Sequence, residues 1–234
     1  MSRISLMAVM NDKRFCLVER LNRHSFCKCQ DDRGFSLVEL LVSLVITLII
    51  LGVAVATFSG ALGSRDRESS KTDALTSAQA ALNIMSREIG NSGYGLTSNG
   101  LVLADCTDKR LHFRTNIVNA GNSIATDAPG EDLTFYWDNT VAGSVVRYDA
   151  YNGGTTSGVI NRVSDVDFVY YNYTVDPITG VVTVAAGSAA ANTARVTITL
   201  TVILANVRGQ PTGQTVKISS DVTLRNSPYM LGQY

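Results

Sequence analysis

One long uncharged segment constrains the fold of this chain more than any other feature. Residues 40–64 contain no charged side chain, and the predominantly apolar stretch 40–62 is 23 residues long. A helix needs about 20 apolar residues to cross the hydrocarbon core of a bilayer. A buried core helix is the alternative, but an uncharged run of this length is typical of a membrane span. A secretory signal peptide would end its apolar stretch after about 7–15 residues. We therefore predict one membrane-spanning helix.

The charges on the two sides of this segment indicate its orientation. The whole chain has a formal net charge of zero, but residues 1–34 carry seven basic and four acidic side chains, and residues 35–234 carry 13 basic and 16 acidic ones. Basic segments beside a span stay in the cytoplasm. We therefore expect a cytoplasmic N-terminus and place the larger part of the chain on the opposite side. This charge balance argues against nucleic-acid binding through a broad basic surface.

The boundary between the basic segment and the span has an unusual motif. It reads Arg33-Gly34-Phe35-Ser36-Leu37-Val38-Glu39. Glu39 lies about one helical turn inside the apolar run, where an unpaired carboxylate is costly or becomes protonated. Either this side chain reaches back to the lipid headgroups, or it needs a cationic partner in an assembled state.

These residues resemble the class III signal of type IV prepilins and pseudopilins, in which a basic residue and Gly precede Phe-Thr/Ser-Leu-X-Glu and an apolar helix. The resemblance implies that a membrane-bound prepilin peptidase cuts between Gly34 and Phe35 on the cytoplasmic face and methylates the new amine of Phe35. It also implies that Glu39 pairs with the N-terminal amine of a neighbouring subunit. Two charges that are each costly in lipid would then neutralise one another.

Two features depart from the usual pattern of that family. The leader of 34 residues, ending at Gly34 before Phe35, is longer than most, and Met7 or Met10 is an alternative start. Many major pilins also carry a proline within the apolar helix, whereas residues 35–61 contain none. The missing proline fits a minor pilin or a pseudopilin at least as well as a major subunit.

The apolar helix is expected to continue into an amphipathic segment. Its apolar side chains recur at steps of three and four residues, which is typical of a helix that packs one narrow face on another element. Glycines just after residue 89 are expected to end it. We predict one helix over residues 36–89. The membrane segment is assigned to residues 35–62. The amphipathic segment is assigned to residues 63–94, which include the glycine-rich turn after the helix. The stripe consists of Leu75, Ala78, Leu82, Met85 and Ile89.

Residues 95–234 are predicted to form a β-rich domain. Runs rich in β-branched and aromatic residues alternate with turn signals. Short connections favour an antiparallel sheet with the helix packed on one face, so the predicted fold class is α+β and pilin-like. Segment 185–194 is low in complexity and expected to be a mobile loop. The expected strands cover residues 111–114, 133–137, 145–148, 166–173, 181–185, 195–204 and 216–224.

Segments 87–95 and 221–226 resemble minor pilins of the PilW type, which are similar to the J-type pseudopilins of type II secretion. The resemblance implies a role in a small complex of minor pilins that primes filament assembly near the tip. The implied partners are the prepilin peptidase, other minor and major pilins, the inner-membrane assembly platform and, before assembly, the lipid bilayer. The implied location is the inner membrane, with one span and a periplasmic C-terminal domain, and later the pilus at the cell surface.

Two other interpretations fit the same residues. One is a pseudopilin of a type II secretion system. The other is a permanently anchored outer binding domain, for which a tyrosine-rich strand at 170–173 and the acidic loops would be the binding elements. An anchored enzyme is the least expected class, because the chain has no Gly-x-Ser-x-Gly elbow and no phosphate-binding Walker loop. We predict no catalytic residue and no cofactor.

Three cysteines and a histidine near the N-terminus are candidate metal ligands. Cys27 and Cys29 are separated by one residue, whereas zinc sites favour two to four, and these residues lie in the predicted leader with Cys16 and His24. We therefore predict no metal site. After cleavage Cys106 would be the only cysteine, and we expect a buried or unpaired thiol there, with pairing to another subunit as the lesser alternative.

Other candidate ligands are expected to have ordinary structural roles. We expect His112 to be a packed or surface residue rather than a base, and Tyr170, Tyr171 and Tyr173 to alternate between the faces of a strand. Two acidic groups resemble no calcium-binding loop in their spacing and are expected to be solvated. They are Asp127, Glu131 and Asp132, and Asp165 and Asp167.

Overall fold

The computed structural model describes residues 7–11, 14–18, 27–29, 35–119, 123–140, 143–207 and 210–233, with only the backbone of the first three ranges. The chain forms two compact units, Met1–Gly60 and Ala61–Tyr234. In the first unit, three short strands pair antiparallel in the order β1-β2-β3. No strand was expected in this segment from its sequence. They are β1 (Met7–Asn11), β2 (Arg14–Val18) and β3 (Cys27–Cys29).

Helix α1 runs from Leu37 to Ile89 and confirms the predicted helix to within one residue at its start. Its residues up to Gly60 are all exposed, and its buried residues begin at Ser70. The buried set follows the predicted stripe, except that Leu75 is only half-buried. The buried positions are Ser70, Ala78, Ala81, Leu82, Met85 and Ile89.

Glycines shape the turn that ends α1. Gly93 has a φ of +78°, which L side chains rarely adopt, and its amide donates to the carbonyl of Arg114 at 2.9 Å. Gly100 also has a φ of +78°, and a Cβ there would lie 2.2 Å from the amide nitrogen of Gly93. Only residues without a side chain allow the end of the helix to approach strand β4 this closely.

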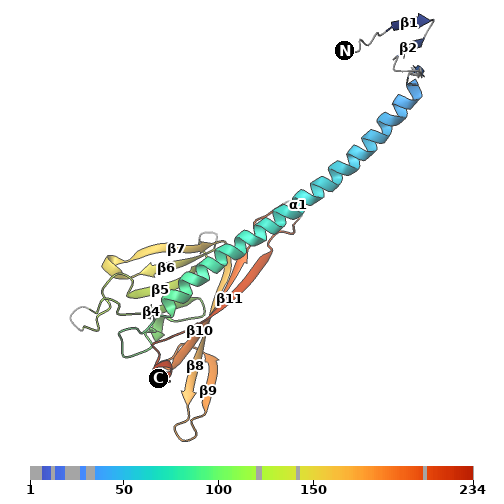
Figure 1. Cartoon of the computed structure of the whole chain (residues 1–234). Coiled ribbons are helices and arrows are strands. Elements are labelled where there is room, and N and C mark those ends of the chain that lie inside the picture. The colour runs from blue at the N-terminus through green and yellow to red at the C-terminus, as the bar shows by residue number, and fades with distance from the viewer. Residues whose placement is uncertain are drawn as a thin grey trace, which may run out of the picture. The chain divides into compact units, whose positions relative to one another are not determined.

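Two antiparallel sheets of four strands each follow the helix (Figure 1). One has the order β4-β5-β6-β7 and the other β11-β10-β8-β9. The first consists of β4 (Arg110–Arg114), β5 (Asp132–Asp138), β6 (Ser144–Asp149) and β7 (Thr155–Asn161). The second consists of β8 (Val163–Val175), β9 (Val182–Gly187), β10 (Thr193–Ile203) and β11 (Thr215–Thr223). Short helices η1 (Leu103–Asp105), η3 (Tyr151–Gly153) and α2 (Pro228–Leu231) complete the described elements.

Strand β10 is one of the two inner strands of the second sheet, and its sequence explains its place. It pairs with both β8 and β11. Val196, Ile198 and Leu200 are fully buried on one face, while Thr197 and Thr199 are half-buried on the other. This alternation matches the two-residue period of a strand with one face on the core.

The core of the second unit joins the second half of α1 to both sheets. It contains Met85 and Ile89 from the helix, Phe113 and Phe135 from the first sheet, and Ile198 from the second. The fold class is therefore α+β, as predicted, with the helix packed on antiparallel strands.

Three details of the predicted β domain are wrong. The strands form two sheets rather than one, and the chain passes from β7 to β8 through a single residue, Arg162, whose φ is +60°. Strand β7 was not predicted, because residues 155–158 lack apolar alternation and include Gly158. Segment 185–194 is not a loop throughout, because β9 extends to Gly187 and β10 begins at Thr193.

Candidate processing and assembly site

The start of α1 combines a helix cap with a charged residue. The Leu40 amide donates to the Ser36 carbonyl at 3.1 Å, which places Ser36 at the N-cap. Glu39 follows three residues later, in the Ser-x-x-Glu pattern of a capping box. A carboxylate in the first turn also interacts favourably with the helix dipole. Glu39 can therefore stabilise the helix start independently of any role between subunits.

The residues of the predicted processing motif are only partly described. Arg33 and Gly34 lie outside the described residues. Phe35 is 76% exposed. The Glu39 carboxylate is also exposed, and it has no hydrogen-bond or ion-pair partner among the residues whose side chains the structure describes.

The first part of α1 exposes a continuous apolar surface. One 18-residue window of this helix is long and apolar enough to cross a membrane, and none of that window is buried by the rest of the chain. Contiguous apolar surfaces of this extent mark contacts with a membrane or with another protein. The helix is compatible with membrane anchoring.

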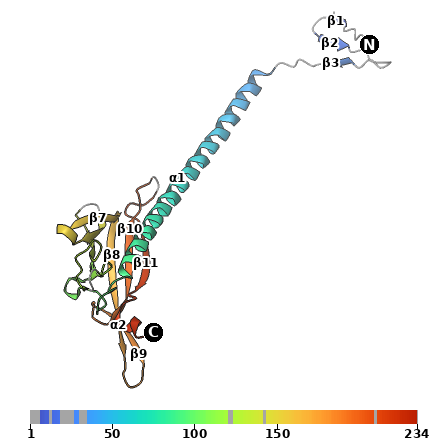
Figure 2. The ribbon, with the colours of Figure 1, turned by 60° about the vertical axis from the view of Figure 1, so that its left-hand side comes forward.

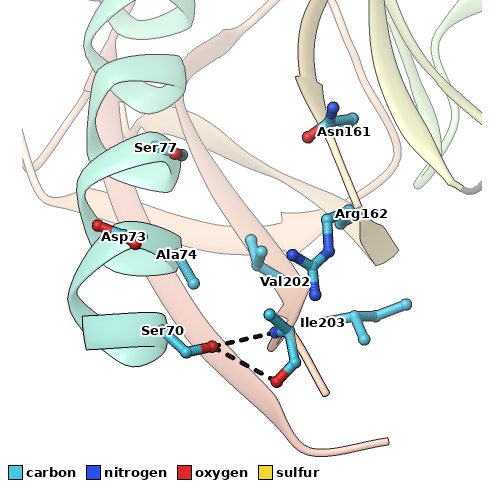
Figure 3. A pocket seen from close by; sticks show the side chains of 9 residues that line it. Ser70, Asp73, Ala74, Ser77, Asn161, Arg162, Val202 and Ile203 are labelled. Carbon is cyan, nitrogen blue, oxygen red and sulfur yellow. Dashed lines mark hydrogen bonds between the residues drawn. The ribbon is translucent and has the colours of Figure 1, made fainter. Parts of the chain in front are cut away.

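The second half of α1 is tied to the β strands by polar contacts. The Ser70 hydroxyl accepts a hydrogen bond from the Ala205 amide at 3.1 Å (Figure 3). Further along the helix, the Ser86 hydroxyl lies 3.2 Å from that of Ser220. The Arg147 guanidinium on β6 donates to the Glu88 carboxylate at 2.8 Å, and both side chains are about one-fifth exposed. These contacts join the helix to both sheets.

An open hollow lies beside the Ser70 contact (Figure 3). Its volume is about 150 Å³. Asp73 and Ser77 line it from α1, and Arg162 lines it from the β7–β8 connection. No lining hydroxyl is hydrogen-bonded to a base, because the Ser70 oxygen is engaged by Ala205 and Ser77 has no such bond among the described contacts. The hollow thus has no paired nucleophile and base.

His112 is held between two carboxylates. Its Nδ1 lies 2.8 Å from Asp105, and its Nε2 lies 2.5 Å from Asp132, which also accepts from Arg114 Nε at 2.8 Å. The hydrogen bond with His112 is the main cause that lowers the pKa of Asp105 below its usual value. Both ring nitrogens are occupied, so the imidazole, which is 12% exposed, links η1, β4 and β5. His112 is thus packed, as predicted.

Glu131 is not a solvated loop residue, contrary to the sequence analysis. Its side chain is buried, and its carboxylate accepts the amides of Val118 at 2.8 Å and Ala128 at 3.0 Å. These hydrogen bonds offset the cost of burying the charge. Asp127 is exposed, as predicted. Glu131 therefore holds together the long connection between β4 and β5.

The second acidic group is also placed differently from the prediction. Asp165 and Asp167 lie in β8, not in a loop, and are half-buried. Lys109 Nζ lies 2.7 Å from Asp165 and 3.7 Å from Asp167. The two carboxylates form a lysine-binding pair that ties β8 to the segment before β4.

Cys106 is half-buried beside Tyr170. Burial raises the pKa of the Cys106 thiol, so the reactive thiolate is disfavoured. Its Sγ lies 3.3 Å from the carbonyl of His112. Burial likewise raises the pKa of the Tyr170 hydroxyl, which lies 2.9 Å from the Thr107 carbonyl. Among the residues whose side chains are described, Cys106 forms no disulfide, and pairing to another subunit is not tested.

The tyrosines of β8 alternate between faces, as predicted. Tyr170 is buried, whereas Tyr171 lies on the other face under the Arg195 guanidinium, 4.0 Å from the ring centre. Tyr173 packs on Tyr229 of α2, with 4.6 Å between ring centres. These partners cannot be identified from local sequence, because they depend on strand register and on the position of the C-terminal helix α2.

The described His, Cys, Asp and Glu side chains are the candidates for holding a metal ion. Within the ranges whose side chains are described, no three His, Cys, Asp or Glu residues form a group able to hold a metal ion. His24 lies outside the described residues, and nothing is described of the side chains of Cys16, Cys27 and Cys29.

Residues 29–55 match the prokaryotic N-terminal methylation motif. No curated protein and no solved structure gives a match to the chain. The motif spans the helix start and most of the exposed apolar surface of α1.

The chain thus carries a type IV prepilin-like signal on an α+β fold. This signal supports processing of the pilin or pseudopilin type, by a prepilin peptidase, and assembly with pilin-type partners in general. It points to a structural protein rather than an enzyme.

Proposed function

We propose that this protein is a minor pilin of a type IV pilus that takes part in priming or tip assembly of the filament. The main observation in support of this proposal is the N-terminal methylation motif at residues 29–55, which includes the start of an exposed apolar helix. The absence of proline from residues 35–61 and the PilW-like segments 87–95 and 221–226 support the finer assignment. Before assembly the protein spans the inner membrane once, with residues 95–234 in the periplasm.

In this proposal, residues 1–34 are a leader. Prepilin peptidase cuts between Gly34 and Phe35, beside Arg33, and methylates the new amine of Phe35. The mature chain then starts two residues before the first residue of α1. Cleavage also removes the three strands β1, β2 and β3 from the subunit.

Glu39 then provides the charge that pairs with a neighbour's amine. Its carboxylate is exposed and without a described partner, within an apolar surface that lipid or other subunits must cover. An isolated charge is costly in such surroundings, whereas a close opposite charge offsets that cost. Subunit docking that brings Glu39 close to the neighbour's N-terminal amine is therefore favoured over docking that leaves these two charges apart.

Mass spectrometry tests the cleavage. Co-expressed with an active prepilin peptidase, the full chain should lose residues 1–34 and begin with N-methylated Phe35. The Gly34→Val variant is the matched control and should stay intact, because a branched side chain replaces the smallest residue beside the cut bond. Intact wild-type chain, in cells where a known prepilin is processed, would refute the proposal.

Two substitutions separate the roles of Glu39. Glu39→Gln keeps a side chain suited to the capping box but removes the charge, and Glu39→Ala removes both. If charge pairing matters, both variants are cleaved normally, and both are depleted from sheared filaments on immunoblots. Normal incorporation of Glu39→Gln alone would assign Glu39 to the helix cap.

Deletion of the gene distinguishes the pilus from the alternative of a type II secretion pseudopilin. The proposal predicts fewer surface pili and unchanged release of type II substrates, with rescue by the wild-type gene but not by Gly34→Val. Loss of secretion with normal piliation would favour the pseudopilin. Full-length chain kept in the membrane and absent from filaments would favour a permanently anchored binding domain.

A further inference from the structure

Strand β9 is a free edge of the second sheet. It ends the order β11-β10-β8-β9, pairs only with β8, and all six of its residues are exposed. Figure 1 and Figure 2 both show the β8–β9 hairpin extending past the neighbouring strands. Its outer amides and carbonyls therefore face no other described strand. Such an edge is a template for the addition of another strand.

The register of the hairpin gathers apolar side chains on one face. Directly opposite residues share a face, so the pairs Val175–Val182 and Tyr173–Val184 lie together. Val175, Val182 and Val184 are each between 41% and 46% exposed. The other face carries the pair Thr174–Thr183. Tyr229 of α2 covers the Tyr173 end of this face, and the three exposed valines are available for a further contact.

The other three outer strands of the two four-stranded sheets have features that discourage strand addition. Residues before β4 partly cover it, with Leu101 bridged to Phe113. Strand β11 carries Lys217 and Asp221. Strand β7 contains Gly158, and its pairing with β6 is irregular. Charges, bulges and covering segments are common protections of sheet edges. Strand β9 has no charge, no proline and no irregularity in its pairing.

A protein strand fits this edge better than a lipid surface does. Lipid cannot satisfy the free amides of an edge, and residues 177–194 contain no basic side chain to bind anionic headgroups. Antiparallel pairing of two β9 strands about Val184 would place Val182 opposite Ala186 and Thr183 opposite Ala185. No like charges meet in that register. A two-fold contact requires this kind of self-complementary surface.

We propose that two copies of this chain pair β9 with β9 antiparallel, centred on Val184. The contact joins two four-stranded sheets into one and satisfies the free edge of each. The valines of the two hairpins meet on one side of the joined sheet. This contact does not depend on cleavage of the leader.

Cysteine cross-linking of the full chain in membranes tests the contact. In a background with all four native cysteines changed to Ser, Val184→Cys should give a disulfide-linked dimer on mild oxidation. Ser157→Cys, on the exposed edge β7, is the matched control and should remain a monomer. Equal cross-linking of both variants, or none with Val184→Cys, would overturn the proposal. A cross-link of Val184→Cys to a different protein alone would also overturn it.

Charge substitution gives a second test that does not use cysteine. Val184→Lys and Val184→Glu each place like charges opposite one another, and each should weaken dimerisation of the full chain in detergent by about tenfold or more, measured by sedimentation. The two variants mixed should dimerise again, because Lys then faces Glu. Association that Val184→Lys leaves unchanged would come from α1 and would contradict the β9 contact.

Discussion

The two halves of α1 are one continuous helix held in place by different surroundings. Every residue of α1 from Leu37 to Gly60 is exposed, whereas residues 61–89 bury six side chains against the strands of the same unit. The first half has an exposed apolar surface, and the second half contributes to its own domain's core. The helix is continuous because its local sequence favours a helix throughout. Packing on the strands of the same unit stabilises only the second half.

The largest expected difference between the halves comes from truncating one buried and one exposed side chain. Met85 is fully buried, so Met85→Ala should lower the free energy of unfolding of the second unit by about 2–5 kcal/mol. Leu51→Ala, at a residue 56% exposed, should leave it unchanged. Urea unfolding of the full chain in detergent, followed by Trp137 fluorescence, measures both. Trp137 is the only tryptophan and is half-buried on β5, so it reports on the second unit. Equal effects of the two substitutions would contradict the comparison.

A substitution distant from α1 should weaken only its second half. Glu131→Ala leaves the amides of Val118 and Ala128 without their carboxylate and should cost about 2–3 kcal/mol. Hydrogen exchange of the full chain should then speed up in residues 70–89 and not in residues 40–60. Asp127→Ala, at an exposed neighbour, is the control and should change little. Faster exchange in both halves would show that they are energetically coupled.

A smaller effect is expected for the ion pair between the helix and the first sheet. Glu88 and Arg147 lie 2.8 Å apart and are partly shielded from water. A double-mutant cycle with Glu88→Gln and Arg147→Met should give a coupling energy of about 1 kcal/mol, falling with added salt. A coupling indistinguishable from zero would assign the attachment of this half to apolar packing alone.

The smallest expected effect concerns acid pH. The lowered pKa of Asp105 means that the folded state favours its carboxylate, so its contribution to stability is complete above the ordinary pKa of 3.8 and is lost as pH falls through the lower folded value. Trp137 unfolding curves below pH 4 should depend less steeply on pH for Asp105→Asn than for wild type. Identical slopes would show that the link to His112 does not stabilise the fold.

Features that depend on residue spacing within one segment were predicted from the sequence. Features that depend on contacts between distant segments were not. The end of α1 at Ile89 and the alternation along β10 follow from spacing within a single segment. The division into two sheets does not, because strand order depends on which distant segments pair. The burial of Glu131 depends on amides three and 13 residues away along a folded loop.

The candidate processing site and the free edge at β9 also differ in whether the local sequence identifies them. The motif around Phe35 and Glu39 is contiguous and was identified from the sequence, and the family comparison supports it. The free edge at β9 could not be identified in this way. Its small and β-branched residues alone do not show whether a strand is at an edge. Its register with β8 and its terminal place in the sheet identify the edge.

The contact between Ser86 and Ser220 has a consequence for the order of events during synthesis. The two residues are 134 positions apart. At typical rates of about 5–20 residues per second, the ribosome needs roughly 7 to 27 s to add the chain between them. During that interval the apolar stripe of residues 78–89 lacks its last strand. Under the proposed function, the apolar first half of α1 is available for membrane insertion before β11 has been synthesised, so insertion of the helix precedes completion of the β domain.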